Sequence, residues 1–214
     1  MNLTSRAQEI YVQVSQDDTK LGDLRKIAKE IKKDHPLAME LWSTRNFMAQ
    51  QLAILIMDKK FITQEFVDQF DEDIQDLESE ERNQLTDWFM ANQLTKDKKT
   101  KALIESWEHS PSAMQRRIFW YYQARLRWTG QTPPDNTEEL LTSIEARLEK
   151  EVSEVQWAMN FTAGQIGTYD EAYRSRCIEI GKKTGLYRDE VVAKGCTPSY
   201  LPEFIRIQVG KLAK

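Results

Sequence analysis

Apolar residues recur at helical spacing along almost the whole of this 214-residue chain. The segment GDLRKIAKEIKKD (22–34) carries four of them on one stripe: Leu24, Ile27, Ala28 and Ile31. A stripe at this spacing, with lysine and arginine on the other faces, is typical of an amphipathic α-helix. No β-type alternation of useful length occurs, and the few glycines and prolines stand mostly where helices are expected to begin or end. The sequence therefore predicts an all-α fold.

The same spacing predicts the remaining helices. They are expected over residues 36–42, 47–57, 63–77, 79–94, 99–109, 112–128, 136–151, 153–167 and 170–185, with a last helix starting near 198–202. Three polar residues are expected to cap helices: Ser79, Ser110 and Asn136. Pro111 suits a first helical position, and Glu139 gives Asn136 the spacing of a capping box. Residues 130–136 (GQTPPDN) are the clearest loop.

Composition narrows the class of protein. The chain is 40% hydrophobic, enough for a packed core, and we expect one domain over residues 1–214. The longest apolar run, at 52–57, is far too short to cross a membrane, and the N-terminal residues have no signal-peptide character. Two cysteines make no disulfide framework, so a cytoplasmic location is expected. His35 and His109 lack neighbours at metal-ligand spacing, so we expect no metal and no other cofactor.

Charge is arranged in alternating blocks, although the net charge is only −4. The basic blocks are residues 20–33 (net +4), 94–128 (+5) and 174–214 (+5), and the acidic blocks are 62–87 (−9) and 135–154 (−5). If the basic blocks fold onto one surface, that surface can bind an anion although the whole protein is acidic. Solvated helix faces of mixed charge explain the same blocks equally well.

Three stretches resemble one another: LWSTRNFMAQQLA, SWEHSPSAMQRRI and LEKEVSEVQWAM. Two positions are shared, one held by Trp42, Trp107 and Leu148 and the other by Gln50, Gln115 and Gln156. The step from Trp107 to Leu148 is 41 residues, the length of a HEAT-type helical pair. Stacked pairs build a solenoid, an α-α superhelix with an extended concave surface. A compact, non-repeating helical bundle is the alternative.

The clearest chemical pattern is one of binding. No phosphate-cradling glycine loop and no Ser/His/Asp arrangement is present, and Cys196 has no base nearby in sequence. The segment MQRRIFWYYQARLRW (114–128) mixes arginines with aromatic residues. Arg116 and Arg117, at the start of this helix, can grip phosphates, and nearby rings can stack on bases or sugars. Since several of the rings fall on one helical stripe, a place in the core is the alternative for most of them.

Four segments, in order along residues 20–210, resemble the AlkD-type DNA alkylation repair proteins. They are LGDLRKIAKEIKKDHPLAMELWS, DWFMANQL, MQRRIFW, and VQWAMNFTAGQIG followed by GKKTGLYRDEVVAKGCTPSYLPEFI. The resemblance implies a HEAT-like helical solenoid whose basic concave face holds duplex DNA. It also implies a relation to glycosylases that excise cationic alkylated purines without a metal or an organic cofactor, and without burying the base in a pocket.

The resemblance also implies which residues would form the catalytic site. The family's catalytic helix carries Trp and, four residues later, Asp; here these positions hold Trp88 and Asn92. An amide has the size of a carboxylate but no charge, so it neither offsets a developing oxocarbenium ion nor serves as a base. A second aromatic residue matches Phe161, with Trp157 one turn earlier as the alternative. The family often has charged residues near Met48 and Gln50, so another charged pair is missing here.

Three hypotheses follow. The first is a weak or altered glycosylase with Trp88 and Phe161 flanking the sugar, and the second is a non-catalytic protein that binds duplex or unusually structured DNA. The expected DNA contacts are Arg25, Lys29, Gln50, Arg116, Arg117 and Trp157. The third is a solenoid that binds a protein partner through its concave face. Asn92 argues against the first hypothesis, and the acidic net charge argues for the third. We expect a monomer.

Overall fold

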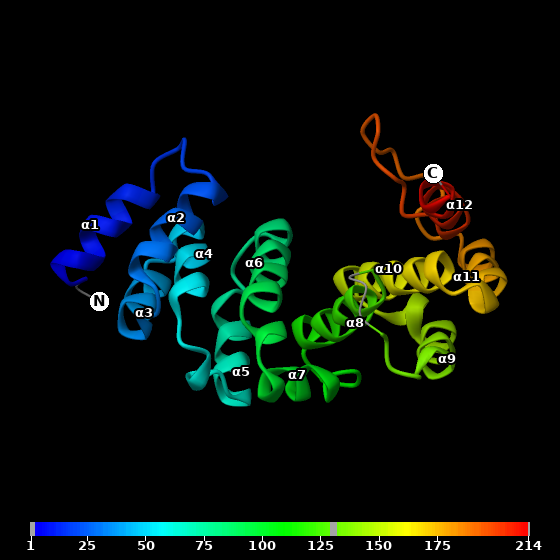
Figure 1. The fold of residues 1–214 in the computed structure, drawn as a ribbon, viewed down its shortest axis with the longest axis horizontal. Helices are drawn as coiled ribbons and strands as arrows, with labels where there is room; N and C mark the ends of the chain where they lie inside the picture. The colour runs from blue at the N-terminus through cyan, green and yellow to red at the C-terminus, as the bar shows by residue number, and fades with distance from the viewer. Residues whose placement is uncertain (1–2, 129–131, 214) are drawn as a thin grey trace. The chain divides into compact units, whose positions relative to one another are not determined.

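The structure, a computed structural model, describes residues 3–128 and 132–213, and all regular structure within those ranges is helical. The α-helices are α1 (Ser5–Val14), α2 (Leu21–Ile31), α3 (His35–Ser43), α4 (Phe47–Ile56), α5 (Gln64–Asp73), α6 (Ser79–Asn92), α7 (Lys98–Glu105), α8 (Ala113–Trp128), α9 (Thr137–Arg147), α10 (Ser153–Tyr169), α11 (Glu171–Thr184) and α12 (Leu201–Leu212) (Figure 1). Short 3-10 turns, η1 (Lys59–Phe61), η2 (Leu94–Lys96) and η3 (Leu148–Lys150), lie between some of them. The all-α prediction is confirmed.

Contacts along the chain group into two compact units. The first unit, Met1–Glu105, contains α1 to α7, and the second unit, Ser106–Lys214, contains α8 to α12. Each unit has a buried core of its own. The expectation that residues 1–214 form a single domain stays a prediction.

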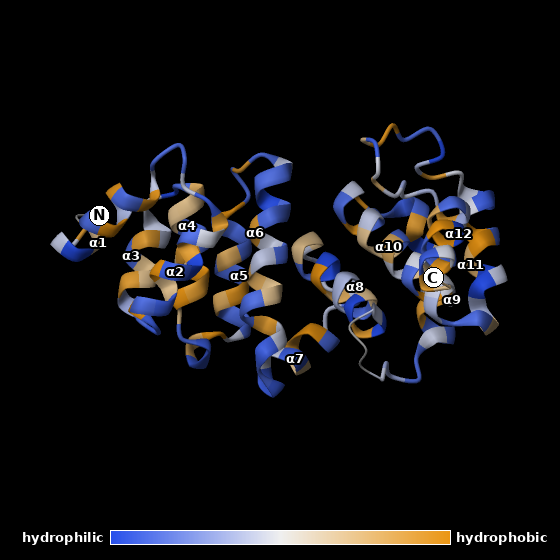
Figure 2. Ribbon diagram, turned by 45° about the horizontal axis from the view of Figure 1, so that its top comes forward, coloured by the Kyte–Doolittle hydropathy of each residue, from blue (hydrophilic) through white to orange (hydrophobic). Residues whose placement is uncertain are grey.

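The core of the first unit is built around α4, where seven of the ten residues are buried. This helix packs against α2, α3 and α6. The helix expected at 47–57 is therefore confirmed, and most of its residues are buried. Figure 2 shows the opposite character in α6, whose first turns, SEERNQ, are hydrophilic. A stack of rings joins three helices, because Phe70 of α5 lies 4.6 Å from Trp42 of α3 and 4.3 Å from Phe89 of α6 between ring centroids.

The core of the second unit is built around α10, which packs against α8, α9, α11 and α12. Two glycines of this helix allow α12 to come close. A Cβ added at Gly164 would lie 2.8 Å from the Phe204 ring, and one added at Gly167 would lie 2.5 Å from Ile205. On the side of α8, the Thr162 hydroxyl donates to the Trp120 carbonyl oxygen at 2.6 Å. Small residues and buried hydroxyls therefore fix how these helices cross.

Helix starts follow the expected chemistry at some positions. The Asp34 side chain accepts from the backbone N–H of Leu37 at the start of α3, where Pro36 occupies the first turn as predicted. The Asn46 side chain accepts in the same way at the start of α4. Helix α2 ends earlier than residue 34, because Lys32 takes a positive φ of 65° that no helix accommodates.

The predicted caps at Ser79 and Ser110 are wrong, whereas Asn136 does occupy the N-cap position of α9. The N-cap of α6 is Glu78, and Ser79 is the first residue of the helix. Helix α8 begins at Ala113, where the Ser112 hydroxyl accepts from the helix instead, so Pro111 lies outside it. At this N-cap position the Asn136 side chain makes no capping bond to α9 among the described residues, so the predicted capping box does not form.

The Asn136 side chain does not cap α9 because its amide forms hydrogen bonds with residues of α8. Its Oδ1 accepts from Arg127 Nη2 at 3.2 Å, and its Nδ2 donates to Gln123 Oε1 at 3.2 Å. The loop predicted at 130–136 is non-helical over residues 132–136, whereas residues 130 and 131 lie outside the described residues. None of the helices in the described ranges is long and apolar enough to span a bilayer.

Candidate nucleic-acid interface

The first candidate cluster lies in the first unit, where Trp88 of α6 meets α4 and α2. The indole Nε1 of Trp88 donates to the backbone carbonyl oxygen of Gln51 at 3.1 Å. The Arg25 guanidinium carbon lies 4.9 Å from the centre of the Trp88 ring, within the range of a cation–π interaction. Trp88 is half-buried and Arg25 is exposed. A permanently charged, exposed guanidinium therefore lies against the ring of this half-buried indole.

Asn92 lies one turn further along α6 and is half-buried. Its Nδ2 donates to the Trp88 backbone carbonyl oxygen at 2.8 Å, so the amide nitrogen is turned back onto its own helix. The remaining amide oxygen is a neutral acceptor. At this position the side chain can accept a hydrogen bond, but it supplies no negative charge to balance a cation.

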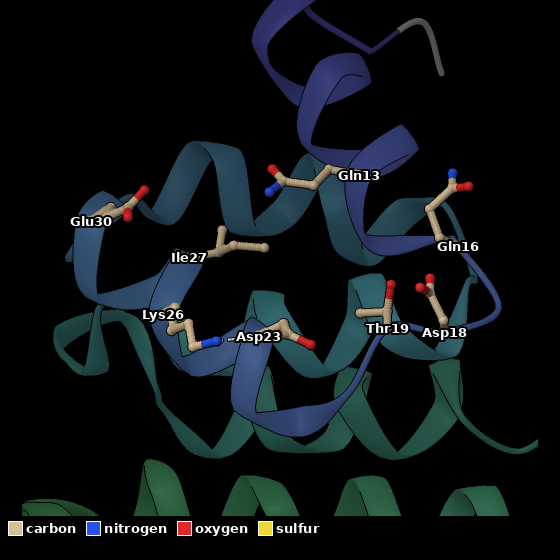
Figure 3. Close-up of a pocket in the computed structure, with 8 residues that line it drawn as sticks. All are labelled: Gln13, Gln16, Asp18, Thr19, Asp23, Lys26, Ile27 and Glu30. Atoms are coloured by element: carbon tan, nitrogen blue, oxygen red, sulfur yellow. Dashed lines mark hydrogen bonds and ion pairs between the residues drawn. The ribbon is translucent and has the colours of Figure 1, made fainter.

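Helix α2 presents two different faces. Arg25 and Lys29 are exposed and stand four residues apart, so they share one face. A neighbouring face borders a hollow of about 360 Å³ between α1 and α2 (Figure 3), lined by Gln13, Gln16, Asp18, Thr19, Asp23, Lys26, Ile27 and Glu30. Three carboxylates border this hollow, and its one cation, Lys26, is paired with Asp23 at 3.1 Å. The Arg25–Lys29 face therefore suits phosphates, and the hollow does not.

Gln50, expected to contact DNA, is only 1% exposed. It lines a hollow of about 270 Å³ together with Trp42, Ser43, Arg45 and Asp73. Its Oε1 is buried and has no hydrogen-bond partner among the described residues. A contact from Gln50 to DNA stays a prediction, and it would require a donor to enter this hollow.

Arg116, at the start of α8, is engaged inside the second unit. Its guanidinium bonds Glu151 Oε2 at 3.0 and 3.2 Å, and its Nη1 donates to the carbonyl oxygens of Ser110 and Pro111 at 2.7 and 2.9 Å. Glu151 also accepts from Arg147 at 2.7 Å. These bonds use most of the donors of Arg116, so a phosphate role, which stays a prediction, would compete with them.

Arg117 is 5% exposed. Its Nη1 donates to the Glu154 carbonyl oxygen at 3.0 Å, and its guanidinium carbon lies 4.8 Å from the centre of the Trp157 ring. The expected phosphate residue and the expected aromatic residue are thus neighbours. Burial leaves Arg117 better suited to orienting Trp157 than to meeting a phosphate directly.

Phe161 and Trp157, the two alternatives for the second aromatic residue of the site, lie side by side on α10, so both belong to the same cluster. Their rings are stacked, with centroids 5.2 Å apart and planes 9° from parallel. Tyr121 and Trp128 of α8 reach the same cluster, at 5.8 and 5.4 Å from Phe161. Phe204 of α12 meets Phe161 edge-on at 5.8 Å. All but Phe204 are half-buried, so these rings form a partly open aromatic surface.

A small cavity of about 120 Å³ opens beside this surface. Its lining residues are Trp157, Asn160, Phe161, Thr197, Ser199 and Phe204. Asn160 is 3% exposed, and its Nδ2 donates to the Ser199 carbonyl oxygen at 2.8 Å. The Oδ1 of the same amide is buried and has no hydrogen-bond partner among the described residues.

A model of the family described as DNA alkylation repair enzyme matches residues 19–186. The chain belongs to this family. The matched range covers α2 to α11 and therefore includes both candidate clusters except for Phe204 and the loop before α12. The family resemblance read from the sequence is confirmed. A comparison with curated proteins finds no match.

One solved structure shares the fold. It comes from work on a new family of proteins related to the HEAT-like repeat DNA glycosylases with affinity for branched DNA structures. It is similar over 97% of this chain and 89% of its own, with a TM-score of 0.68 and 18% sequence identity. At this identity the likeness establishes the fold alone, and it confirms the prediction of a HEAT-like helical protein.

Sequence reasoning missed part of the aromatic cluster in this member of the family. Tyr121, Arg125 and Trp128 share a helical stripe that suggested a place in the core, yet all three are half-buried. Arg125 lies 5.5 Å from the centre of the Trp128 ring. The spacing of these three residues in the sequence did indicate that they share one face of the helix. Asn160 and Phe204 gave none, because only the folded chain brings α12 and its preceding loop against α10.

Proposed function

We propose that this member of the DNA alkylation repair family binds DNA and that its base-excision step is weak or lost because Asn92 occupies the carboxylate position. The contact of Arg25 with Trp88 carries the proposal. Arg25 and Lys29 offer exposed cations to a phosphate backbone, and the Trp88 ring holds one of them in place. The related structure was described for affinity to branched DNA, which supports DNA as the partner.

The same contact argues against efficient excision. Cleavage of a glycosidic bond builds positive charge on the sugar, and a negative group beside it lowers the barrier. Here the amide of Asn92 is neutral, and the cation of Arg25 lies over the aromatic ring that a cationic sugar would face. A carboxylate 4 Å from a forming cation contributes about 4 kcal/mol at an effective dielectric constant of 20. That energy corresponds to about a thousandfold in rate.

DNA binding is tested by measuring affinity for linear duplex and for a four-way junction over a salt series. Phosphate contacts release condensed counterions, so the affinity should fall steadily as salt rises. Absence of binding to either DNA at low salt would rule out the proposal and leave a protein partner as the better hypothesis.

The missing charge is tested by Asn92→Asp, with release of methylated purines from alkylated DNA as the measurement. Single-turnover conditions with excess protein separate chemistry from affinity. We expect the variant to release bases faster than wild type, with about a thousandfold as the ceiling. Combining it with Arg25→Gln should raise the rate further, because the opposing cation is removed. Wild-type release as fast as that of Asn92→Asp would show that the charge at this position is not what limits excision.

A further inference from the structure

We propose that Lys32, at the end of α2, is a further phosphate contact that completes a basic row with Arg25 and Lys29. The inference rests on the proposed DNA binding and extends the surface that carries it. Three features of Lys32 support this role: its place in the helix, its lack of a carboxylate partner where neighbouring cations have one, and the conformation of its backbone. The three residues are called the α2 row below.

Lys32 lies at the end of the face that Arg25 and Lys29 share. Its backbone N–H donates to the Ala28 carbonyl oxygen at 2.8 Å, so the main chain follows the helical register up to this residue. Positions separated by four and then three residues lie on one face of an α-helix, and all three side chains are exposed. The row spans ~10 Å of helix, a length over which one DNA strand carries about three phosphates.

The cations of this segment differ in whether the chain itself neutralises them. Lys26 bonds Asp23 at 3.1 Å (Figure 3), and Lys33 lies 3.9 Å from Asp58. Within residues 3–128 and 132–213, no ion pair joins any member of the α2 row to a carboxylate. A cation without an internal partner keeps its field for an anion outside the protein. Pairing therefore separates the α2 row from the cations beside it.

The backbone of Lys32 adopts a conformation that suits glycine. Its φ is 65° and its ψ is −127°, in the mirror image of the β region, where a Cβ is crowded by the main chain. At the end of α11 the residue with a positive φ, Gly185, is a glycine. Strained residues of this kind cluster at binding and catalytic sites. We therefore infer that the Lys32 side chain has a role that glycine could not fill.

A cation at the C-terminal end of a helix also interacts with the helix dipole, which is a purely structural role. Lys32→Gly separates the two roles. Because glycine relieves the strained φ, the midpoint of thermal unfolding should stay the same or rise by up to about 4 °C. Loss of one phosphate contact should make the slope of log affinity against log salt shallower by about 0.9, and should lower the affinity for duplex DNA about eightfold at about 0.1 M salt.

Lys32→Arg and Arg45→Gly are the matched controls, with fluorescence anisotropy of a labelled duplex as the measurement. Lys32→Arg keeps the cation and should retain the wild-type slope. Arg45 also follows a helix with a positive φ, of 56°, but its guanidinium is paired with Asp76 at 3.2 Å. Arg45→Gly therefore removes an exposed cation and relieves the same kind of strain, yet it should leave the salt slope unchanged.

A wild-type slope in Lys32→Gly would overturn the contact, and lower stability in that variant would then assign Lys32 to the helix dipole. An equally shallow slope in Arg45→Gly would overturn it as well, because the loss of any exposed cation would then have the same effect. If wild type binds duplex DNA with salt-dependent affinity in either case, the proposed function stands and only the Lys32 contact fails. Absence of such binding by wild type would overturn both.

Discussion

Arginine has two roles at the scale of single residues in this protein. Arg25 is exposed, and among the described residues it is held only against the Trp88 ring, so its donors can reach a phosphate. Arg116, which the sequence marked as a phosphate contact, instead joins Glu151 to the turn before α8. The difference is decided by burial, since the Glu151 side chain is 9% exposed and its charge needs compensation.

Glu151→Gln tests this internal role. The amide keeps the shape but removes the charge that Arg116 and Arg147 share. We expect a loss of about 2 kcal/mol in the free energy of unfolding, the size of a hydrogen bond to a charged group. Urea denaturation followed by circular dichroism measures it. The control is the exposed neighbour Glu149→Gln, expected to change stability by less than about 0.5 kcal/mol. Equal effects of the two variants would contradict a structural role for the pair.

The two cysteines should differ in reactivity. Burial raises the pKa of the Cys177 thiol to about 12, because the thiolate would lose its hydration, whereas Cys196 is exposed. The thiolate is the reactive form, so near about pH 8 a thiol reagent should label one cysteine quickly. The second should react only when urea unfolds the chain. Rapid labelling of two thiols in the native protein would show that Cys177 is accessible.

At the scale of helices, close approach matters more than intrinsic propensity. Gly167 lies in the last turn of α10, where alanine would ordinarily stabilise a helix by up to about 1 kcal/mol. Here an added Cβ would lie 2.5 Å from Ile205 and 3.0 Å from Cys177, so neither α12 nor α11 leaves room for it. The cost of overpacking, ~1–3 kcal/mol, should therefore exceed the gain.

Gly167→Ala and Gly210→Ala form a matched pair for this prediction. An added Cβ at Gly210, in α12, meets none of the described residues within 4 Å. We expect Gly210→Ala to stabilise the protein by up to about 1 kcal/mol and Gly167→Ala to destabilise it. Thermal unfolding compares the two under the same conditions. A stabilised Gly167→Ala would mean that α12 moves away from α10 at little cost.

The helices themselves were largely predictable because their stripes are local properties of the sequence. Their ends were less so: the amide of Asn136 had an equally good partner in Arg127, which is close only after folding. The candidate site also has a part that could be predicted from local sequence and a part that could not. Trp88 and Asn92 follow from spacing and resemblance, but the contact of Arg25 with Trp88 and the unpaired Oδ1 of Asn160 depend on distant helices.

At the scale of the whole molecule, net charge is a poor guide to the partner. The first unit has fifteen basic against twenty acidic residues, and the second has fifteen against fourteen, so neither is strongly basic. The acidic excess of the first unit is concentrated between residues 62 and 87, whereas α2 is basic on its Arg25–Lys29 face. Binding of DNA by such a molecule depends on a local face and should be sensitive to salt.

The double variant Arg25→Gln/Lys29→Gln tests that dependence. If each residue neutralises one phosphate, the slope of log affinity against log salt should become shallower by about 1.8, at about 0.9 per contact. Arg116→Gln, matched in side-chain chemistry, should leave the slope nearly unchanged while lowering stability. Titrations over a salt series with duplex DNA give the three slopes. An unchanged slope in the double variant would remove the α2 face from the interface.

The hydrogen bond from the Trp88 indole to the Gln51 carbonyl has a consequence for how such a chain evolves. It ties α6 to the buried helix α4, so selection for folding alone is enough to retain the tryptophan. Among the described residues the Asn92 amide hydrogen-bonds only its own helix, so the fold depends little on which residue of similar size stands at this position. The presence of a tryptophan at this position of α6 is therefore not in itself evidence of catalysis. The residue one turn later says more about whether the protein can catalyse excision.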